Sequence, residues 1–222
     1  MNLKRVIDVS LAGAALAISA PALLVLAAAV KLDSPGPALF VQTRVGRNRR
    51  PIRVAKFRTM IVDAERRGPV VTAARDSRVT RLGAILRKTK LDELPQLWNV
   101  LCGDMSIVGP RPEVPRYVDQ YRPEWQPLLG VRPGLTDLAS VRFRHEERLL
   151  ATARDRDRAY TDVIMPLKLG LALEGLEHSS VLYDLGLIAR TLAAVVRNDD
   201  AEDPTLDEAR RRIEQLNTRE DA

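Results

Sequence analysis

The sequence predicts a mixed α/β, helix-rich fold: an N-terminal membrane helix broken by a proline, and a compact cytosolic domain with a short hairpin and interfacial helices. Two observations lead to this fold class. An uncharged run covers residues 9–30, and as a straight helix it would measure roughly 33 Å, about the thickness of a hydrocarbon core. Short strand-like stretches and longer stretches with helical spacing follow it. We expect a membrane helix over residues 1–32, a domain over 33–198 and a charged tail over 199–222.

Three relations between the first helix and a membrane stay open. A cleaved secretory signal is favoured by Lys4 and Arg5 before the apolar run. A single crossing is favoured by the length of the run. A re-entrant helix, which returns to the face it entered, is favoured by basic residues at both ends and by Pro21, which cannot donate to the carbonyl one turn earlier. In that case Ala20 and Pro21 form the expected helix break.

Composition limits the partners and the metals. The net charge of +6 and the pI near 9.8 indicate an anionic partner: nucleic acid, a phosphorylated metabolite or a membrane surface. Aromatic residues make up 4% of the chain, which is sparse for stacking on nucleic acid bases, and no zinc-finger, basic-zipper or RNA-recognition signature is present. With one cysteine and two histidines, a metal would be a hard cation such as Mg²⁺ rather than zinc.

The remaining elements follow from periodicity and turn residues. A Pro/Gly turn precedes the expected hairpin, and a glycine ends the helix that starts at Asp92. Further on, a Pro-Gly turn is followed by chain that we expect to be extended, and the charged tail is compatible with one helix. The expected elements are strands 38–42 and 52–57, helix 79–88, the helix from Asp92 to Gly103, a buried strand in "MSIVGPRP", extended chain in "VRPGLTDLASVRF", and helices 164–177 and 181–197.

The most informative stretch is "TKLDELPQLWNVLCGDMSIVGPRP", in which Asp92 and Glu93 stand side by side. In a structural interpretation Asp92 caps a helix and stabilises it by about 1 kcal/mol, and adjacent acids also occur at positions 146–147. In a chemical interpretation, Arg87 upstream and Arg111 downstream keep the carboxylate pKa low and the group ionised. Such a carboxylate can hold Mg²⁺ or attack phosphorus. The spacing alone leaves both interpretations open.

Four motifs together resemble those of a known family. "FVQTRVGR", "KFRTM", "RKTKLDELPQLWNVLCGDMSIVGPRP" and "VRPGLTDLAS" follow a membrane helix with a central proline. This combination resembles the bacterial sugar transferases, the small monotopic phosphoglycosyl transferases, over residues 4–197. The resemblance implies transfer of a sugar 1-phosphate from a UDP-sugar to undecaprenyl or another polyprenyl phosphate, with release of UMP. This reaction is the first membrane step of glycan or exopolysaccharide assembly.

The resemblance also implies roles for individual residues. Asp92 would be the nucleophile of a covalent two-step mechanism and a Mg²⁺ contact, and Glu93 would position the metal or the lipid phosphate. Both belong to the expected catalytic pair and the expected metal site. Arg87 and Arg111 would contact phosphate or nucleotide. Weaker candidates for substrate contact are Lys56, Arg58 and Arg132, and Pro110 would shape the loop.

The same resemblance places the chain at the bacterial cytoplasmic membrane, with its domain on the cytoplasmic face and in contact with membrane lipid but not nucleic acid. A homodimer is one open alternative. Two departures stand out: Ala20 occupies a place where relatives commonly have serine, and Ala172, with Glu174 nearby, falls where relatives have a further acid. Residues 136–147 also differ and would bear on sugar choice or lipid contact. The rival from another class is a basic, membrane-anchored scaffold without catalysis.

Overall fold

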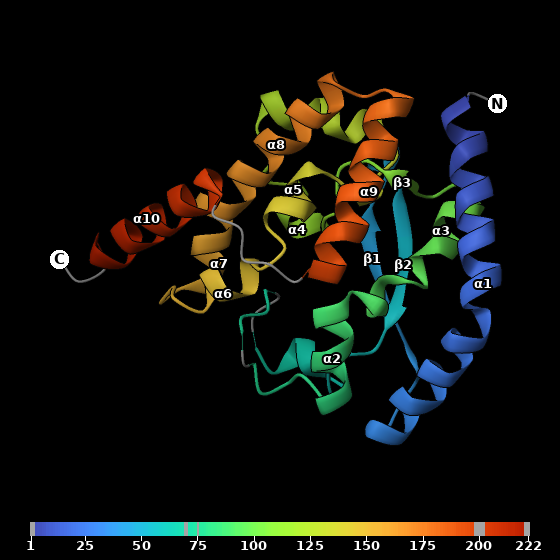
Figure 1. The fold of residues 1–222 in the computed structure, drawn as a ribbon. Coiled ribbons are helices and arrows are strands. Elements are labelled where there is room, and N and C mark those ends of the chain that lie inside the picture. The colour runs from blue at the N-terminus through green and yellow to red at the C-terminus, as the bar shows by residue number, and fades with distance from the viewer. Residues whose placement is uncertain (1–2, 69–70, 75, 198–202, 220–222) are drawn as a thin grey trace.

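The computed structural model of the protein describes residues 3–68, 71–74, 76–197 and 203–219. Within these ranges helices dominate, and the strands form two small sheets, β1–β2 and β3–β4. The predicted helix-rich, mixed fold is confirmed. Figure 1 shows α1 along one side of the molecule and α10 on the opposite side, with the hairpin and α9 between them. The predicted boundary between domain and tail, at residues 198–199, lies outside the described residues.

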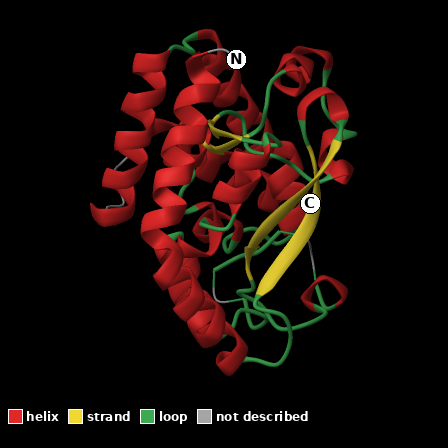
Figure 2. Cartoon of the chain, turned by 90° about the vertical axis from the view of Figure 1, so that its right-hand side faces the viewer, coloured by secondary structure: helices red, strands yellow, loops and turns green. Residues whose placement is uncertain are grey.

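Helix α1 covers Leu3–Asp33 and contains Pro21 in its interior. Its length and composition would allow it to cross a membrane. A break in the helix was expected at Ala20 and Pro21, but α1 continues through both residues. A proline removes one backbone hydrogen bond and bends a helix without ending it, and Figures 1 and 2 both show α1 bending along its length.

Both halves of α1 are attached to the same domain. Near its start, the buried Asp8 carboxylate accepts hydrogen bonds from the Ser106 hydroxyl at 2.8 Å and from the Ile107 amide at 3.1 Å. Just past its end, the Arg58 guanidinium donates to the Ser34 hydroxyl and to the Ser34 carbonyl, each at 2.8 Å. The helix is therefore held at two points by one compact body.

The predicted hairpin is confirmed. Strands β1 (Leu39–Val45) and β2 (Pro51–Phe57) pair antiparallel, in register from Leu39 opposite Phe57 to Val45 opposite Pro51. A 3-10 turn over Arg47–Arg49 joins them, and Asn48 takes the left-handed conformation that a tight turn requires (φ 55°). Figure 2 shows the hairpin as a long twisted ribbon.

Two helices flank the acidic pair. Helix α2 covers Arg81–Thr89 and begins at the Thr80 hydroxyl, which accepts a hydrogen bond from the first turn. A single 3-10 turn, Leu91–Glu93, leads on toward α3, which covers Gln96–Cys102. Gly103 ends α3 with a left-handed conformation (φ 91°), the usual reason for glycine at this position. The prediction of a helix over 79–88 is confirmed, and so is the end at Gly103.

The second sheet is formed by two strands that follow the acidic pair in the sequence. Strand β3 (Ser106–Val108) is buried, as predicted, and runs parallel to β4 (Gly134–Thr136). The two backbones approach so closely that a Cβ atom on Gly134 would lie 2.2 Å from the Gly109 amide nitrogen. Glycine at this position therefore fixes the path of the loop that follows β3.

The prediction of extended chain after the Pro-Gly turn is wrong beyond β4. Residues Leu138–Arg142 form helix α5 instead. The reason is local: the Asp137 carboxylate accepts a hydrogen bond from the Ser140 amide at 2.6 Å and caps the helix start.

The C-terminal half supplies most of the largest apolar core. The predicted helices 164–177 and 181–197 correspond to α8 and α9, and the tail forms one helix, α10, whose Ala209 and Ile213 are fully buried against that core. The elements are α4 (Pro115–Val118), α6 (Glu146–Leu150), α7 (Arg156–Ala159), α8 (Met165–Glu177), α9 (Val181–Arg197) and α10 (Pro204–Arg219), with 3-10 turns Ala64–Arg66 and Pro123–Gly130 and a π-helical turn Tyr160–Ile164.

Candidate active site

Asp92 and Glu93 lie in the 3-10 turn between α2 and α3. Lys90 turns the chain out of α2 with a left-handed conformation (φ 58°), and Pro95 occupies the position just before α3. The prediction that Asp92 caps the following helix is therefore wrong. The first residue of α3 is Gln96, with Pro95 as its capping residue, so the helix begins about one turn later than expected. The capping role that would have explained Asp92 structurally is not available.

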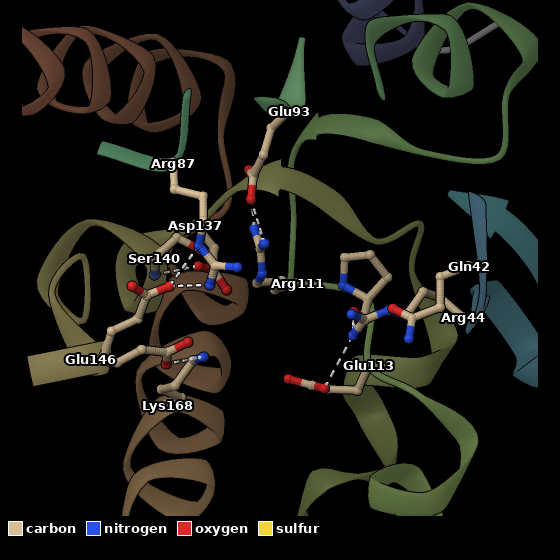
Figure 3. A network of polar contacts seen from close by, with 12 residues as sticks. Gln42, Arg44, Arg87, Glu93, Arg111, Glu113, Asp137, Ser140, Glu146 and Lys168 are labelled. Atoms are coloured by element: carbon tan, nitrogen blue, oxygen red, sulfur yellow. Dashed lines mark hydrogen bonds and ion pairs between the residues drawn. The ribbon is translucent and has the colours of Figure 1, made fainter. Parts of the chain in front are cut away.

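Glu93 is bound by Arg111, which stands in the Gly-Pro-Arg-Pro loop after β3. The Arg111 guanidinium donates from Nη1 to Oε2 at 3.2 Å and from Nη2 to Oε1 at 2.5 Å. Figure 3 shows the two side chains pointing at each other end to end. Burial alone would raise the pKa of Glu93, but the charge and hydrogen bonds of Arg111 hold it well below its usual range. Glu93 is therefore ionised and committed to Arg111.

Asp92 has the opposite surroundings. Its side chain is buried, and burial together with the charge of Glu93 raises its pKa to about 6. Lys56 and Lys90 lower it only in part. The expectation that nearby cations keep this pKa low is wrong, because the loss of hydration outweighs them. The Oδ1 atom is buried and has no hydrogen-bond partner within the part of the chain that the structure describes, so one carboxylate oxygen is left unsatisfied.

Two predicted cations lie close to the pair. Lys56 comes from β2, and burial, followed by the charge of Arg44, lowers its pKa to about 8. Arg87 comes from the last turn of α2 and donates to Glu147, with its Nε 3.1 Å from Oε1. The charges of Lys56 and Arg87 both act on Asp92. The structure thus brings these two residues and Arg111 to the acidic pair, as the sequence predicted.

A cavity of about 520 Å³ opens beside the pair. Its lining includes the cations Lys56, Arg87, Arg111, Arg44 and Lys168. The described lining of the cavity does not include Asp92 or Glu93 themselves. It does include the cations that interact with them. The cavity concentrates positive charge around a space large enough for a nucleotide-sized anion.

The other predicted contact residues lie elsewhere or are engaged. Arg58 borders the cavity, but its guanidinium also donates to the Pro37 carbonyl at 2.7 Å and so ties the end of α1 to the hairpin. Arg132 donates to the Gly103 carbonyl at 2.9 Å. Together with Pro110 it lines a second cavity of about 250 Å³, which reaches the start of α1. Their roles in substrate binding stay predictions.

Among the lining residues of the main cavity that sequence reasoning missed, five form two groups of polar contacts. Three belong to one contact group: Arg44 donates to Glu113 at 3.5 Å, and the Tyr160 hydroxyl donates to the same carboxylate. The other two, Glu146 and Lys168, form an ion pair with an N–O distance of 2.7 Å. The adjacent acids at 146–147 were visible in the sequence, but nothing there indicated that the chain returns to α2 at this point. Ala172, which stands where relatives were expected to have a further acid, lines the second cavity and not this one.

A hard cation fits part of this site. Mg²⁺ is commonly held by one or two carboxylates together with substrate phosphate oxygens and water. The buried and unpartnered Oδ1 of Asp92 suits one such position. Both oxygens of Glu93 already accept from Arg111, so Asp92 is the better ligand of the two. No group of three or more candidate ligand side chains occurs within the described residues, and further ligands would have to come from substrate.

Fold and site together define a protein with a membrane-length helix and, beside an acidic pair, a cavity lined by cations. Such a cavity is suited to binding phosphate groups. The comparison with protein families then gives the particular family. The chain belongs to the bacterial sugar transferases, whose family model matches residues 1–198. The resemblance noted in the sequence is confirmed.

Several named relatives are similar to the chain. The UDP-glucose:undecaprenyl-phosphate glucose-1-phosphate transferase of Caulobacter vibrioides is 42% identical over 203 residues, which cover 89% of this chain and 71% of the relative. A putative undecaprenyl-phosphate N-acetylgalactosaminyl 1-phosphate transferase of Bacillus subtilis is 47% identical over 56% of this chain and 69% of its own length. A UDP-glucose:undecaprenyl-phosphate glucose-1-phosphate transferase of Escherichia coli is 38% identical, over 86% of this chain and 39% of the relative.

Proposed function

We propose that the protein transfers a sugar 1-phosphate from a UDP-sugar to undecaprenyl phosphate and releases UMP. The observation that carries this proposal is the cavity lined by Lys56, Arg87 and Arg111 beside the buried Asp92. Relatives that are 38–47% identical are named for the same kind of reaction. Their names differ in the sugar, so the sugar itself is left to experiment. In a cell this reaction would begin glycan or exopolysaccharide assembly.

The proposed chemistry has two balanced steps. An oxygen of Asp92 attacks the β-phosphorus of the UDP-sugar, the bond from that phosphorus to the bridging oxygen breaks, and UMP leaves. An oxygen of the lipid phosphate then attacks the same phosphorus, the bond to Asp92 breaks, and the carboxylate is restored. Splitting the reaction keeps two polyanionic substrates from having to meet in one transition state. The buried Asp92 has to become accessible when the diphosphate binds.

The remaining charged residues have supporting roles in this proposal. Arg111, Arg87 and Lys56 neutralise the diphosphate, and Arg111 is held in place by Glu93. Mg²⁺ bound at Asp92 would stabilise the charge that develops on the leaving UMP. The pKa of Asp92, about 6, leaves the carboxylate mostly ionised near neutral pH, as a nucleophile requires.

The attachment of α1 supports a re-entrant membrane helix on the cytoplasmic face. Asp8 near the start of the helix binds Ser106, and Ser34 just beyond its end accepts from Arg58, so both ends are bound to the same domain. A helix that crossed the bilayer once would leave its two ends about 30 Å apart across the hydrocarbon core. With both ends at one face, the site can meet a soluble nucleotide sugar and a membrane-embedded lipid phosphate.

The experiment that tests the proposal is UMP release in detergent or nanodiscs. The protein would be given undecaprenyl phosphate and a panel of UDP-sugars, with Mg²⁺ and with EDTA, alongside the Asp92→Asn variant. We expect UMP from at least one sugar with Mg²⁺, none from the variant, and a phosphosugar adduct on the Asp92 peptide when the lipid is left out. Folded, membrane-bound protein that gives no UMP with any sugar would favour the scaffold alternative.

A further inference from the structure

Glu146 and Lys168 form a partly buried ion pair in the wall of the main cavity, outside the acidic pair and the predicted phosphate contacts. Glu146 is the first residue of α6, and Lys168 lies in α8, with 2.7 Å between Nζ and Oε2. The Lys168 side chain is 10% exposed and that of Glu146 is 28% exposed. Lys168 also lies 5.5 Å from the centre of the Tyr160 ring. Both residues line the cavity.

Stability alone gives little reason for this pair. Removing two charges from water costs about as much as their attraction returns, and apolar residues of similar size often serve as well. Burial would raise the pKa of Glu146, but Lys168 lowers it below its usual value, so the carboxylate stays charged. An ionised acceptor and an ammonium donor are thus presented side by side to the cavity.

The chemistry of the pair favours a neutral group that both donates and accepts hydrogen bonds. A carboxylate repels the diphosphate, so Glu146 suits a different part of the substrate. Hydroxyl groups of a sugar can donate to a carboxylate oxygen and accept from an ammonium at the same time. Such charged hydrogen bonds discriminate strongly between ligands that do and do not make them.

The position of the pair relates it to the reacting phosphate. Arg111 binds Glu93 on one side, and its charge also acts on Glu146. Figure 3 shows Arg111 between Glu93 and the region of Glu146 and Lys168. In a UDP-sugar the sugar is attached to the β-phosphate itself, whereas the ribose lies one phosphate further away. A β-phosphate at Arg111 therefore places the sugar nearer to the pair than the ribose.

We propose that Glu146 and Lys168 recognise hydroxyl groups of the sugar carried by the nucleotide and so contribute to sugar selection. This inference rests on the proposed function. It also gives one member of the stretch 136–147, Glu146, a direct connection to substrate. Figure 3 shows a second ion pair of the cavity lining, Arg44 and Glu113, on the other side of Arg111.

Binding tests the inference separately from turnover. In an Asp92→Asn background, which blocks chemistry, the dissociation constants of UDP and of UDP-glucose, UDP-galactose and their N-acetylated counterparts would be measured by calorimetry. Glu146→Gln should reduce the advantage of the preferred UDP-sugar over UDP by about tenfold or more. The affinity for UDP itself should change by less than about twofold.

Lys168→Met should act in the same direction, and the double variant guards against misfolding because it leaves no unpaired charge. Glu208→Gln, on the exposed face of α10, is the matched control and should change nothing. Equal loss for UDP and every UDP-sugar would overturn the inference, because it would indicate a ribose contact or a structural role. An unchanged ratio would overturn it as well. If the wild-type chain releases no UMP yet shows the Glu146-dependent ratio, the proposed function fails while sugar recognition stands.

Discussion

Arg111 and Glu93 form a two-point ion pair, with nitrogen–oxygen distances of 3.2 and 2.5 Å. This contact separates the two neighbouring acids. The charge of ionised Glu93 is compensated by Arg111, and the pKa of Glu93 is lowered. The pKa of Asp92, in contrast, is raised to about 6. Adjacent carboxylates whose surroundings drive their pKa values apart are suited to different tasks. Glu93 holds Arg111 in place, and in the proposed reaction Asp92 is the reactive group.

Glu93→Gln should lower turnover through Arg111 rather than through a metal. We expect a loss of about tenfold or more, equivalent to about 1.4 kcal/mol in the barrier, and a loss of about 1–3 kcal/mol in the free energy of unfolding. Rates of UMP release across a Mg²⁺ titration, with urea unfolding in detergent, measure both effects. Glu124→Gln at an exposed surface pair is the control. Restoration of the rate by high Mg²⁺ would contradict this role and make Glu93 a metal ligand.

Turnover should depend on the ionisation of Asp92. Since its pKa is about 6, the ionised and reactive fraction falls as the pH falls through that value. The kcat/KM for UMP release with Mg²⁺ well below saturation reports the pKa of the free enzyme, so from about pH 5 to about pH 8 it should rise with an inflection near 6. A rate that stays constant down to about pH 5 would show that Asp92 is not the group that must be ionised.

Asp92→Asn should abolish turnover and yet stabilise the fold. The folded-state pKa lies above the ordinary value of 3.8, at about 6, so ionised Asp92 opposes folding at neutral and higher pH. Removing that charge should add up to about 3 kcal/mol, at about 1.4 kcal/mol per pKa unit. The gain should be complete above the folded pKa and should disappear as the pH falls toward 3.8. Unfolding curves at several pH values measure it, and a variant less stable at about pH 8 would contradict the burial argument.

Most helices and strands could be predicted correctly from local sequence patterns. The hairpin, α2, β3, α8 and α9 all have clear periodicity or turn residues at their ends. Two of the local errors lie at helix starts: α3 begins only after Pro95, and the Asp137 side chain caps α5 where extended chain was expected. A capping side chain within a Pro-Gly segment was the available signal for α5.

The site was predictable only in part. Asp92, Glu93 and Arg111 lie in one continuous motif, so their proximity follows from a short stretch of chain. Glu146 and Lys168 come from segments far along the sequence, and no periodicity indicates where those segments pack. The raised pKa of Asp92 depends on burial by distant residues. The packing of α10 through Ile213 likewise depends on a tertiary surface, since the tail is strongly charged and gave no sign of a core contact.

The last prediction concerns the membrane arrangement of α1. Because Asp8 and Arg58 hold both halves of the helix to one domain, the N-terminus and the tail should lie on the same side of the membrane. Single cysteines at Leu3 and Gln215, in a Cys102→Ser background, would report this through a membrane-impermeant maleimide. Neither should react in intact spheroplasts, and both should react after permeabilisation.

A cysteine in a known periplasmic loop of another protein is the positive control for labelling from outside. Labelling of residue 3 alone in intact spheroplasts would establish a single crossing and contradict the re-entrant arrangement. The buried Asp8 adds an independent check. Asp8→Ala would leave the Ile107 amide unpaired and should cost about 1–3 kcal/mol in the free energy of unfolding, a loss that a helix standing free of the domain would not show.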